Sequence, residues 1–210
     1  LQVSGLAFGM SLILVTVAGG SLLLLLLMTA GLSIILGMGM PTAVIYILLA
    51  ILVAPSLTEF GVPALAAHLF LFYFGMLSMI TPPMCIATFA AATIARCDFW
   101  SAGWFGARLG IVAYVIPFIF VFHPELLLIG DPWEITLAII TALLGVMFLA
   151  TGFAGYLFSV IGPINRTALV AAGLCLIPSP LDSRVWLVVN VVGLAVGLGV
   201  ALRQRMLAGR

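Results

Sequence analysis

The chain has 210 residues, of which 65% are hydrophobic and 6% are charged, and its formal net charge is +1. A soluble domain carries about 25% charged residues, so a chain this poor in charge cannot cover itself with a water-facing surface. The formal net charge of +1 also excludes a basic surface that could bind nucleic acid. The composition therefore predicts an all-α polytopic membrane protein in a lipid bilayer, with no nucleic-acid partner.

Charge is distributed unevenly along the chain. Glu59 is the single charged residue between Leu1 and Ala95, and all the others lie between Arg96 and Arg210. A segment this long without charge is solvated by lipid or by other apolar protein. Its first part, Val3 to Ala18, is expected to be a transmembrane helix.

The first interruption of the apolar sequence is Gly37-Met38-Gly39-Met40-Pro41-Thr42. Glycine permits unusual backbone angles, and proline cannot continue a preceding helix but starts a new one well. The arm after the break, Thr42 to Ala54, would be about 20 Å long at helical rise, which is short for a full span. Together with the arm Ser21 to Leu36 it predicts either a re-entrant hairpin or two full helices with a cytoplasmic turn.

Thr81-Pro82-Pro83 interrupts the next apolar stretch, Ala64 to Ala95. Successive prolines remove two N–H donors and disfavour helix at the residue before them. As one helix the stretch would be about 48 Å long, too long for one span, while Met84 to Ala95 alone would be about 18 Å. One span broken near its middle is therefore expected, with a plain proline kink as the alternative.

Further spans are expected at Gly103 to Phe122, with a kink at Pro117, at Ile135 to Phe158 and at Val185 to Leu202, while Thr167 to Ile177 is short. Arg203, Arg205 and Arg210 place the C-terminus in the cytoplasm by the positive-inside rule. Gly193 and Gly197 form a GxxxG pattern on the last span, which is typical of a helix-packing face.

The two breaks together indicate a transport site. Irregular backbone at membrane depth must be buried or line a cavity, where unwound carbonyls can coordinate a cation. Neither break has an acidic or basic residue beside it in the sequence. This favours an ion site made of carbonyls and hydroxyls over a proton relay.

Several short motifs give a more specific indication. In chain order they are Ala18-Gly19-Gly20, Gly37-Met38-Gly39-Met40-Pro41-Thr42-Ala43, the run from Ala67 to Pro83, Arg108-Leu109-Gly110, and the run from Leu126 to Gly130. Together they resemble the large membrane subunit of TRAP transporters, of the type paired with TAXI substrate-binding proteins. The resemblance is dense from about residue 15 to residue 130 and weaker beyond.

This resemblance implies a sodium-coupled, elevator-type permease of the bacterial inner membrane. It would import small organic acids delivered by a periplasmic substrate-binding protein. Such permeases have two inverted repeats, each with a re-entrant hairpin and a broken helix, and this chain looks like the second repeat. Its expected partners are then the first-repeat half and a small membrane subunit, separate or fused.

The resemblance also implies a division of the chain. The expected segments are the end of a transmembrane helix (1–20), a re-entrant hairpin (21–55), a broken transmembrane helix of the transport domain (62–97), a transmembrane helix with an outer loop (101–130), and accessory transmembrane helices (131–210).

The hairpin tip and the second break are implied to share one sodium site. Its ligands would be the backbone carbonyls of Gly37, Met38, Gly39 and Pro82 and the hydroxyls of Thr42 and Thr81. The hydroxyls of Thr42, Ser78 and Thr81 are also expected to reach a substrate carboxylate.

Other functions were weighed against transport. A non-transporting assembly or scaffold module without the first repeat is the second hypothesis. An enzyme is not expected, because the sequence has no Ser/His/Asp set, HExxH motif or Walker loop. Arg108 is expected either to reach lipid phosphate or to pair with Asp98, and His68 either to anchor a helix at the interface or to respond to pH or substrate.

Overall fold

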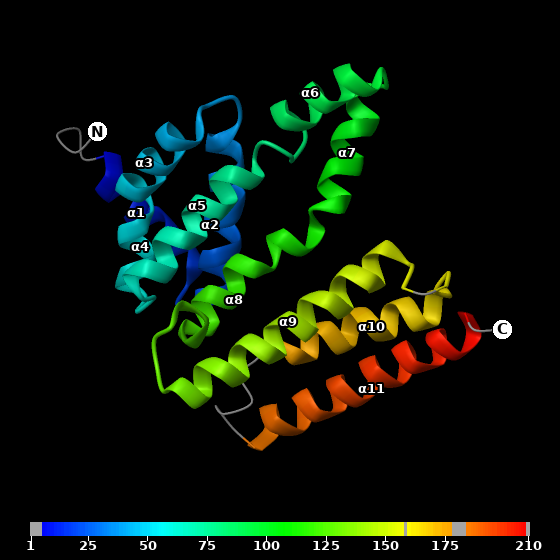
Figure 1. Cartoon of the computed structure of the whole chain (residues 1–210). Helices are drawn as coiled ribbons and strands as arrows, with labels where there is room; N and C mark the ends of the chain where they lie inside the picture. Colours follow the sequence, from blue (N-terminus) through cyan, green and yellow to red (C-terminus); the bar gives the residue numbers. More distant parts are fainter. Residues whose placement is uncertain (1–5, 158, 178–183, 209–210) are drawn as a thin grey trace. The chain divides into compact units, whose positions relative to one another are not determined.

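The computed structural model describes residues 6–157, 159–177 and 184–208 (Figure 1). Arg210, one of the three arginines from which a cytoplasmic C-terminus is expected, lies outside the described residues. The chain divides into an N-terminal unit, Leu1–Val121, and a C-terminal unit, Phe122–Arg210. The described residues form helices and no named β-strand, with one isolated bridge between Tyr156 and Val160. The predicted all-α architecture is confirmed.

The N-terminal unit is built from short helices. In chain order they are α1 (Leu6–Ala18), α2 (Leu22–Gly37), α3 (Thr42–Leu52), α4 (Ala54–Glu59), α5 (Ala64–Leu77), α6 (Ile86–Ala95), α7 (Phe99–Leu109), the 3₁₀ turn η1 (Ile111–Tyr114) and α8 (Ile116–Phe122).

The first predicted break is a helical hairpin. Its arms are α2 and α3, and Pro41 is the N-cap residue of α3, where its missing N–H is not needed. At helical rise α3 is about 17 Å long, too short to cross a bilayer alone, which favours the hairpin over two full helices. Both arms pack against α5. The short helix α4 follows α3 and leads to α5.

The second predicted break separates α5 from α6. It covers residues 78–85, and the peptide bond between Pro82 and Pro83 is cis. A plain kink is therefore excluded, because eight residues leave the helix. The amide of Ala87 donates to the carbonyl of Met79 over 3.1 Å, which connects the two sides of the break.

A third break was predicted at the wrong place. The span from Gly103 to Phe122 is expected to kink at Pro117, but it bends by 61° between α7 and the segment that starts at Ile111. Pro117 is instead the second residue of α8, where a helix tolerates a residue without an N–H. The bend occurs at Gly110, where a Cβ would lie 2.7 Å from the side chain of Ile80.

The C-terminal unit consists of long helices without interruption. After the 3₁₀ turn η2 (Pro124–Leu127) come α9 (Pro132–Ala154), α10 (Pro163–Leu176) and α11 (Arg184–Ala208). Segments of α9 and α11 are long and apolar enough to cross a membrane. With the bent pair of the N-terminal unit and several shorter apolar helices, they make the chain a polytopic membrane protein, as predicted.

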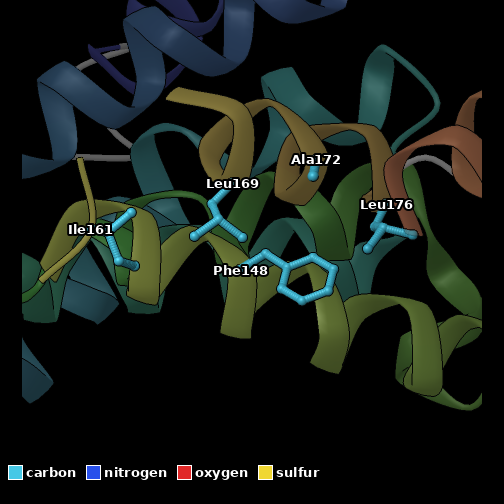
Figure 2. Close-up of a cluster of buried hydrophobic side chains, with 5 residues drawn as sticks. All are labelled: Phe148, Ile161, Leu169, Ala172 and Leu176. Atoms are coloured by element: carbon cyan, nitrogen blue, oxygen red, sulfur yellow. The ribbon is translucent and has the colours of Figure 1, made fainter. Parts of the chain in front are cut away.

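Close glycine contacts hold this bundle together. A Cβ at Gly197 would lie 2.1 Å from the Phe148 ring, and a Cβ at Gly193 would lie 3.0 Å from the carbonyl oxygen of Ala172. The predicted GxxxG is thus a packing face. Figure 2 shows Phe148 beneath Leu169, Ala172 and Leu176 of α10.

Candidate ion and substrate site

The tip of the α2–α3 hairpin lies against the break between α5 and α6. A Cβ on Gly37 would come within 2.5 Å of the Ser78 hydroxyl oxygen and 2.8 Å of its Cβ. A residue larger than glycine therefore does not fit at position 37 without displacing the start of the break. Ser78 is fully buried, and its hydroxyl donates to the carbonyl of Gly75 over 2.6 Å.

Two further contacts join the same elements. The hydroxyl of Thr42, at the start of α3, donates to the sulfur of Met79 over 3.6 Å. Gly39 has a φ of +81°, which suits glycine, and a Cβ there would lie 3.8 Å from the methyl end of Met84. The structure thus brings together two breaks that are about 40 residues apart in the chain.

Several backbone carbonyl oxygens around these contacts accept no hydrogen bond, or only a long one. In the described part of the chain, no hydrogen-bond donor reaches the carbonyls of Met38, Gly39 or Pro82. The carbonyl of Gly37 accepts one long bond of 3.5 Å from the Met40 amide. Carbonyls without donors are costly in apolar surroundings, and they are ligands of the kind that transporters use for sodium. The donor set fits such a cation.

Thr81 is held by two hydrogen bonds. Its Oγ1 lies 2.5 Å from the carbonyl oxygen of Leu77 and 2.6 Å from the hydroxyl oxygen of Tyr114. A carbonyl can only accept, so the single hydroxyl proton of Thr81 points to Leu77, and Tyr114 must be the donor in the second bond. One lone pair of Thr81 Oγ1 stays available to a cation.

Helix α7 packs against α6 and returns to the level of the second break. A Cβ at Gly103 would lie 2.7 Å from the Cys85 sulfur, and one at Gly106 would lie 2.8 Å from a methyl group of Thr88. Since η1 follows directly, Tyr114 reaches Thr81. The second and third breaks are therefore neighbours. The sequence gives no local signal for this, because the contact joins residues 33 positions apart.

A pocket of about 650 Å³ opens beside these two breaks. Its lining residues come from the second break, from one face of α7 and from η1. They are Thr81, Pro82, Ser101, Trp104, Phe105, Ala107, Arg108, Ile111 and Tyr114. A charged residue, Arg108, thus shares a pocket with two of the predicted ligands, although neither break has one beside it in the sequence.

The sequence of this part of the chain matches a known protein family. Residues 1–135 match the family described as tripartite ATP-independent periplasmic transporter, DctM component. The chain belongs to this family. No curated protein and no solved structure matches it.

The DctM match covers the hairpin, all three breaks and the pocket. DctM proteins are the permeases of TRAP-type secondary transporters, which work in a bilayer with a binding protein and a small membrane subunit, and they are not an enzyme family. The predicted resemblance to the large membrane subunit of TRAP transporters is thus confirmed.

One of the two expectations for Arg108 is not met in this DctM chain. Asp98 forms no ion pair with Arg108 within the described residues; its carboxylate caps α7, accepting from the Ser101 amide over 2.8 Å. That backbone hydrogen bond lowers the pKa of Asp98, which lies outside the helices, below its usual value. The guanidinium of Arg108 has no hydrogen-bond partner in the part of the chain that is described.

His68 ties the hairpin to the broken helix. Its Nδ1 lies 3.1 Å from the hydroxyl of Tyr46 on α3, and Tyr46 also makes an edge-to-face contact with Phe72. From the sequence, His68 is expected to anchor a helix at the interface or to respond to pH or substrate, and its contact with α3 is not expected. The contact makes α3 and α5 a connected pair.

Proposed function

We propose that this DctM chain forms part of the permease of a sodium-coupled importer of small organic acids in the bacterial inner membrane. The observation that carries the proposal is the contact between the hairpin tip and the second break, at Gly37–Ser78 and Thr42–Met79. A cation bound there would draw both elements together, so that ion binding and the state of the hairpin are coupled.

The proposed sodium ligands are two sets of oxygen atoms from these breaks. They are the carbonyls of Gly37, Met38, Gly39 and Pro82 and the hydroxyls of Thr42 and Thr81. The donor-free carbonyls and the free lone pair of Thr81 support this assignment. Sodium would supply positive charge, and these oxygens from the two contacting breaks would supply its ligands.

The hydroxyls of Thr42, Ser78 and Thr81 are proposed to contact the substrate. Thr81 lines the pocket, whereas Thr42 faces Met79. Ser78 is buried and bonded to Gly75, so a substrate contact from Ser78 requires that bond to break.

An elevator motion is proposed for the hairpin and the broken helix. It is supported by their connections, since α2 and α3 both pack against α5 and Tyr46 bonds to His68. The two elements would then move as one body with the bound ion. The other parts of the complex are proposed to be a TAXI-type periplasmic binding protein, a small membrane subunit or its fused equivalent, and a first-repeat half. The C-terminus is proposed to lie in the cytoplasm.

Sodium-gradient uptake into proteoliposomes tests this function. The complete permease that contains this chain would be reconstituted with its binding protein and offered labelled pyruvate, succinate, 2-oxoglutarate or glutamate. Thr81→Ala is expected to raise the sodium concentration needed for half-maximal uptake. Thr93→Ala is the matched control, because Thr93 is exposed on α6 and bonds only within its own helix.

Two results would contradict the proposal. Uptake that is unchanged when sodium is replaced by choline would contradict the proposed sodium coupling. Sodium-dependent uptake that is unchanged by Thr81→Ala would contradict the assigned sodium site but not the sodium coupling.

A further inference from the structure

The pocket beside the second and third breaks has one charged lining residue, Arg108. The other charged residues of the N-terminal unit are Glu59, Arg96 and Asp98, and none of them lines it. Arg108 therefore faces the pocket without a carboxylate from its own unit. Arg108 is itself exposed at this pocket, and an ionisable side chain without a carboxylate partner in the apolar part of a membrane protein is a functional candidate.

Three of the α7 residues that line the pocket share one face of the helix. Ser101, Trp104 and Arg108 are three and then four positions apart, the spacing that aligns side chains along a helix. The Ser101 hydroxyl hydrogen-bonds to the exposed Asp98 carboxylate, and a hydroxyl can turn from such an acceptor to donate to a bound anion. A guanidinium and a hydroxyl on one face form a set of donors for two anionic oxygens.

The remaining lining suits the body of a small molecule. Trp104, Phe105 and Ile111 are large and apolar, and a volume of about 650 Å³ is within the range of small-molecule sites. Thr81 and Tyr114 already use their hydroxyl protons, on Leu77 and Thr81 respectively, so they line the pocket as acceptors. The donors thus gather around Ser101 and Arg108.

We propose that this pocket binds the carboxylate of the transported acid, with the Arg108 guanidinium as its charge partner, the Ser101 hydroxyl as a second donor and the α7 aromatic residues against its carbon skeleton. The inference rests on the proposed function and assigns the substrate's charge to α7, which lies outside the site expected from the sequence. Because Thr81 lies at this pocket and at the proposed sodium site, the acid and the ion would bind on either side of one residue.

The phosphate of a lipid headgroup offers Arg108 the same chemistry, an anionic oxygen. The two sources differ in what they respond to. A substrate site responds to the acid concentration and is indifferent to lipid charge, whereas a headgroup site responds to net lipid charge, which phosphatidylcholine lacks although it too carries a phosphate.

Uptake kinetics of Arg108 variants provide the first test, with the complete permease and its binding protein in two kinds of vesicle. One contains phosphatidylcholine alone and the other also contains phosphatidylglycerol. Arg108→Gln is expected to raise the KM for the accumulated acid by about tenfold or more in both, the loss expected for a charge-assisted hydrogen bond. Arg108→Lys should give a smaller rise, because it keeps the charge but loses the planar fork.

Arg96→Gln is the matched control, since Arg96 is an exposed arginine at the end of α6 that does not line the pocket. Its KM should stay at the wild-type value. An Arg108→Gln effect that appears only with phosphatidylglycerol, or a KM unchanged in both vesicles, would overturn the proposal.

Thiol labelling supplies a second test that needs neither transport nor loss of Arg108. In a Cys97→Ser background, Ala107→Cys places a thiol in the pocket lining, and Ala102→Cys places one on α7 outside it. Saturating pyruvate, succinate, 2-oxoglutarate or glutamate is expected to slow maleimide labelling at position 107 and not at position 102. Equal labelling with and without all four acids would overturn the pocket assignment.

These tests separate the two proposals. A wild type that accumulates none of the acids contradicts the proposed function, while protection at position 107 still reports on the pocket. Sodium-dependent uptake with an unchanged KM in Arg108→Gln contradicts the pocket alone.

Discussion

Helices of the N-terminal unit stop and restart at three breaks, whereas α9 and α11 of the C-terminal unit run for 23 and 25 residues without interruption. Both units are apolar, so hydrophobicity does not separate them. The difference lies in the backbone: each break frees carbonyls that a continuous helix would use internally. The breaks of the N-terminal unit therefore offer main-chain carbonyls to the proposed ion, whereas the continuous helices described in the C-terminal unit use theirs internally.

Glycine serves close packing in both units, and this makes the comparison testable. Gly37 allows the hairpin tip to approach the second break, and Gly197 allows α11 to approach Phe148. The same substitution should impair ion binding in the first unit and stability in the second.

Gly37→Ala should have the largest effect. The new methyl group would lie 2.5 Å from the Ser78 hydroxyl oxygen, so the tip and the break must separate. Overpacking of this kind costs about 1–3 kcal/mol, and we expect sodium-dependent uptake to fall by about tenfold. The measurement is the initial uptake rate per folded transporter across a sodium titration. Gly31→Ala on the same helix is the control, because nothing lies within 4 Å of its Cβ. Equal rates in the two variants would contradict the role of the tip.

Gly197→Ala should lower stability and spare transport. Its methyl group would lie 2.1 Å from a Phe148 ring that is 1% exposed and cannot move aside. We expect a loss of about 1–3 kcal/mol in the free energy of unfolding, measured by thermal denaturation in detergent. Uptake per folded transporter should be unchanged. Gly199→Ala, with open space around its Cβ, is the control, and Phe148→Leu should restore part of the loss. A sodium affinity altered by Gly197→Ala would show that the units are not functionally separate.

Tyr114→Phe should have a smaller effect, confined to the ion. It removes the donor to Thr81 and keeps the ring that packs near Phe74. A hydrogen bond contributes about 0.5–1.5 kcal/mol, so the sodium concentration for half-maximal uptake should rise by about two- to tenfold. Tyr73→Phe is the control, since the Tyr73 ring packs against Phe120 and its hydroxyl makes no hydrogen bond within the described residues. A maximal rate that falls at unchanged sodium affinity would argue for a structural role instead.

The smallest effect is expected at Asp98, at the exposed start of α7. Its pKa is lowered by the Ser101 amide, so its capping contribution is present above the usual carboxyl range and is lost as pH falls through the lowered value. Protection of the Ser101 amide from hydrogen exchange, corrected for the intrinsic pH dependence, should decrease over that range. Asp98→Asn keeps a capping oxygen without titrating, and its protection should not depend on pH. A pH response that persists in this variant would locate the titrating group elsewhere.

The first two breaks could be predicted because their causes are local. Proline lacks an N–H wherever it occurs, and paired glycines next to Pro41 favour a turn in almost any context. The break at Gly110 could not be found in this way. Gly110 has an ordinary φ of −81°, and its break coincides with a close approach to Ile80, 30 positions earlier.

For the proposed site too, the features with local causes could be predicted and those that depend on distant contacts could not. The resemblance to TRAP permeases implies Gly37, Thr42 and Thr81 as site residues, and the structure places the two breaks that contain them in contact. Tyr114 and Arg108 were missed as neighbours of Thr81, because α7 must first return along α6 before either residue reaches the second break. The spacing of residues in the sequence does not indicate that α7 packs back along α6.

The scarcity of charge in α2 to α6 has an electrical consequence. These helices and their connections contain one formal charge, Glu59. A nearly neutral body does little work against the membrane potential, whereas each elementary charge that crosses 100 mV exchanges about 2.3 kcal/mol. If this part of the permease moves with its cargo, the voltage dependence of uptake arises mainly from the bound ions and acid. Current measured per molecule of acid would then give the number of sodium ions minus the negative charges on the acid.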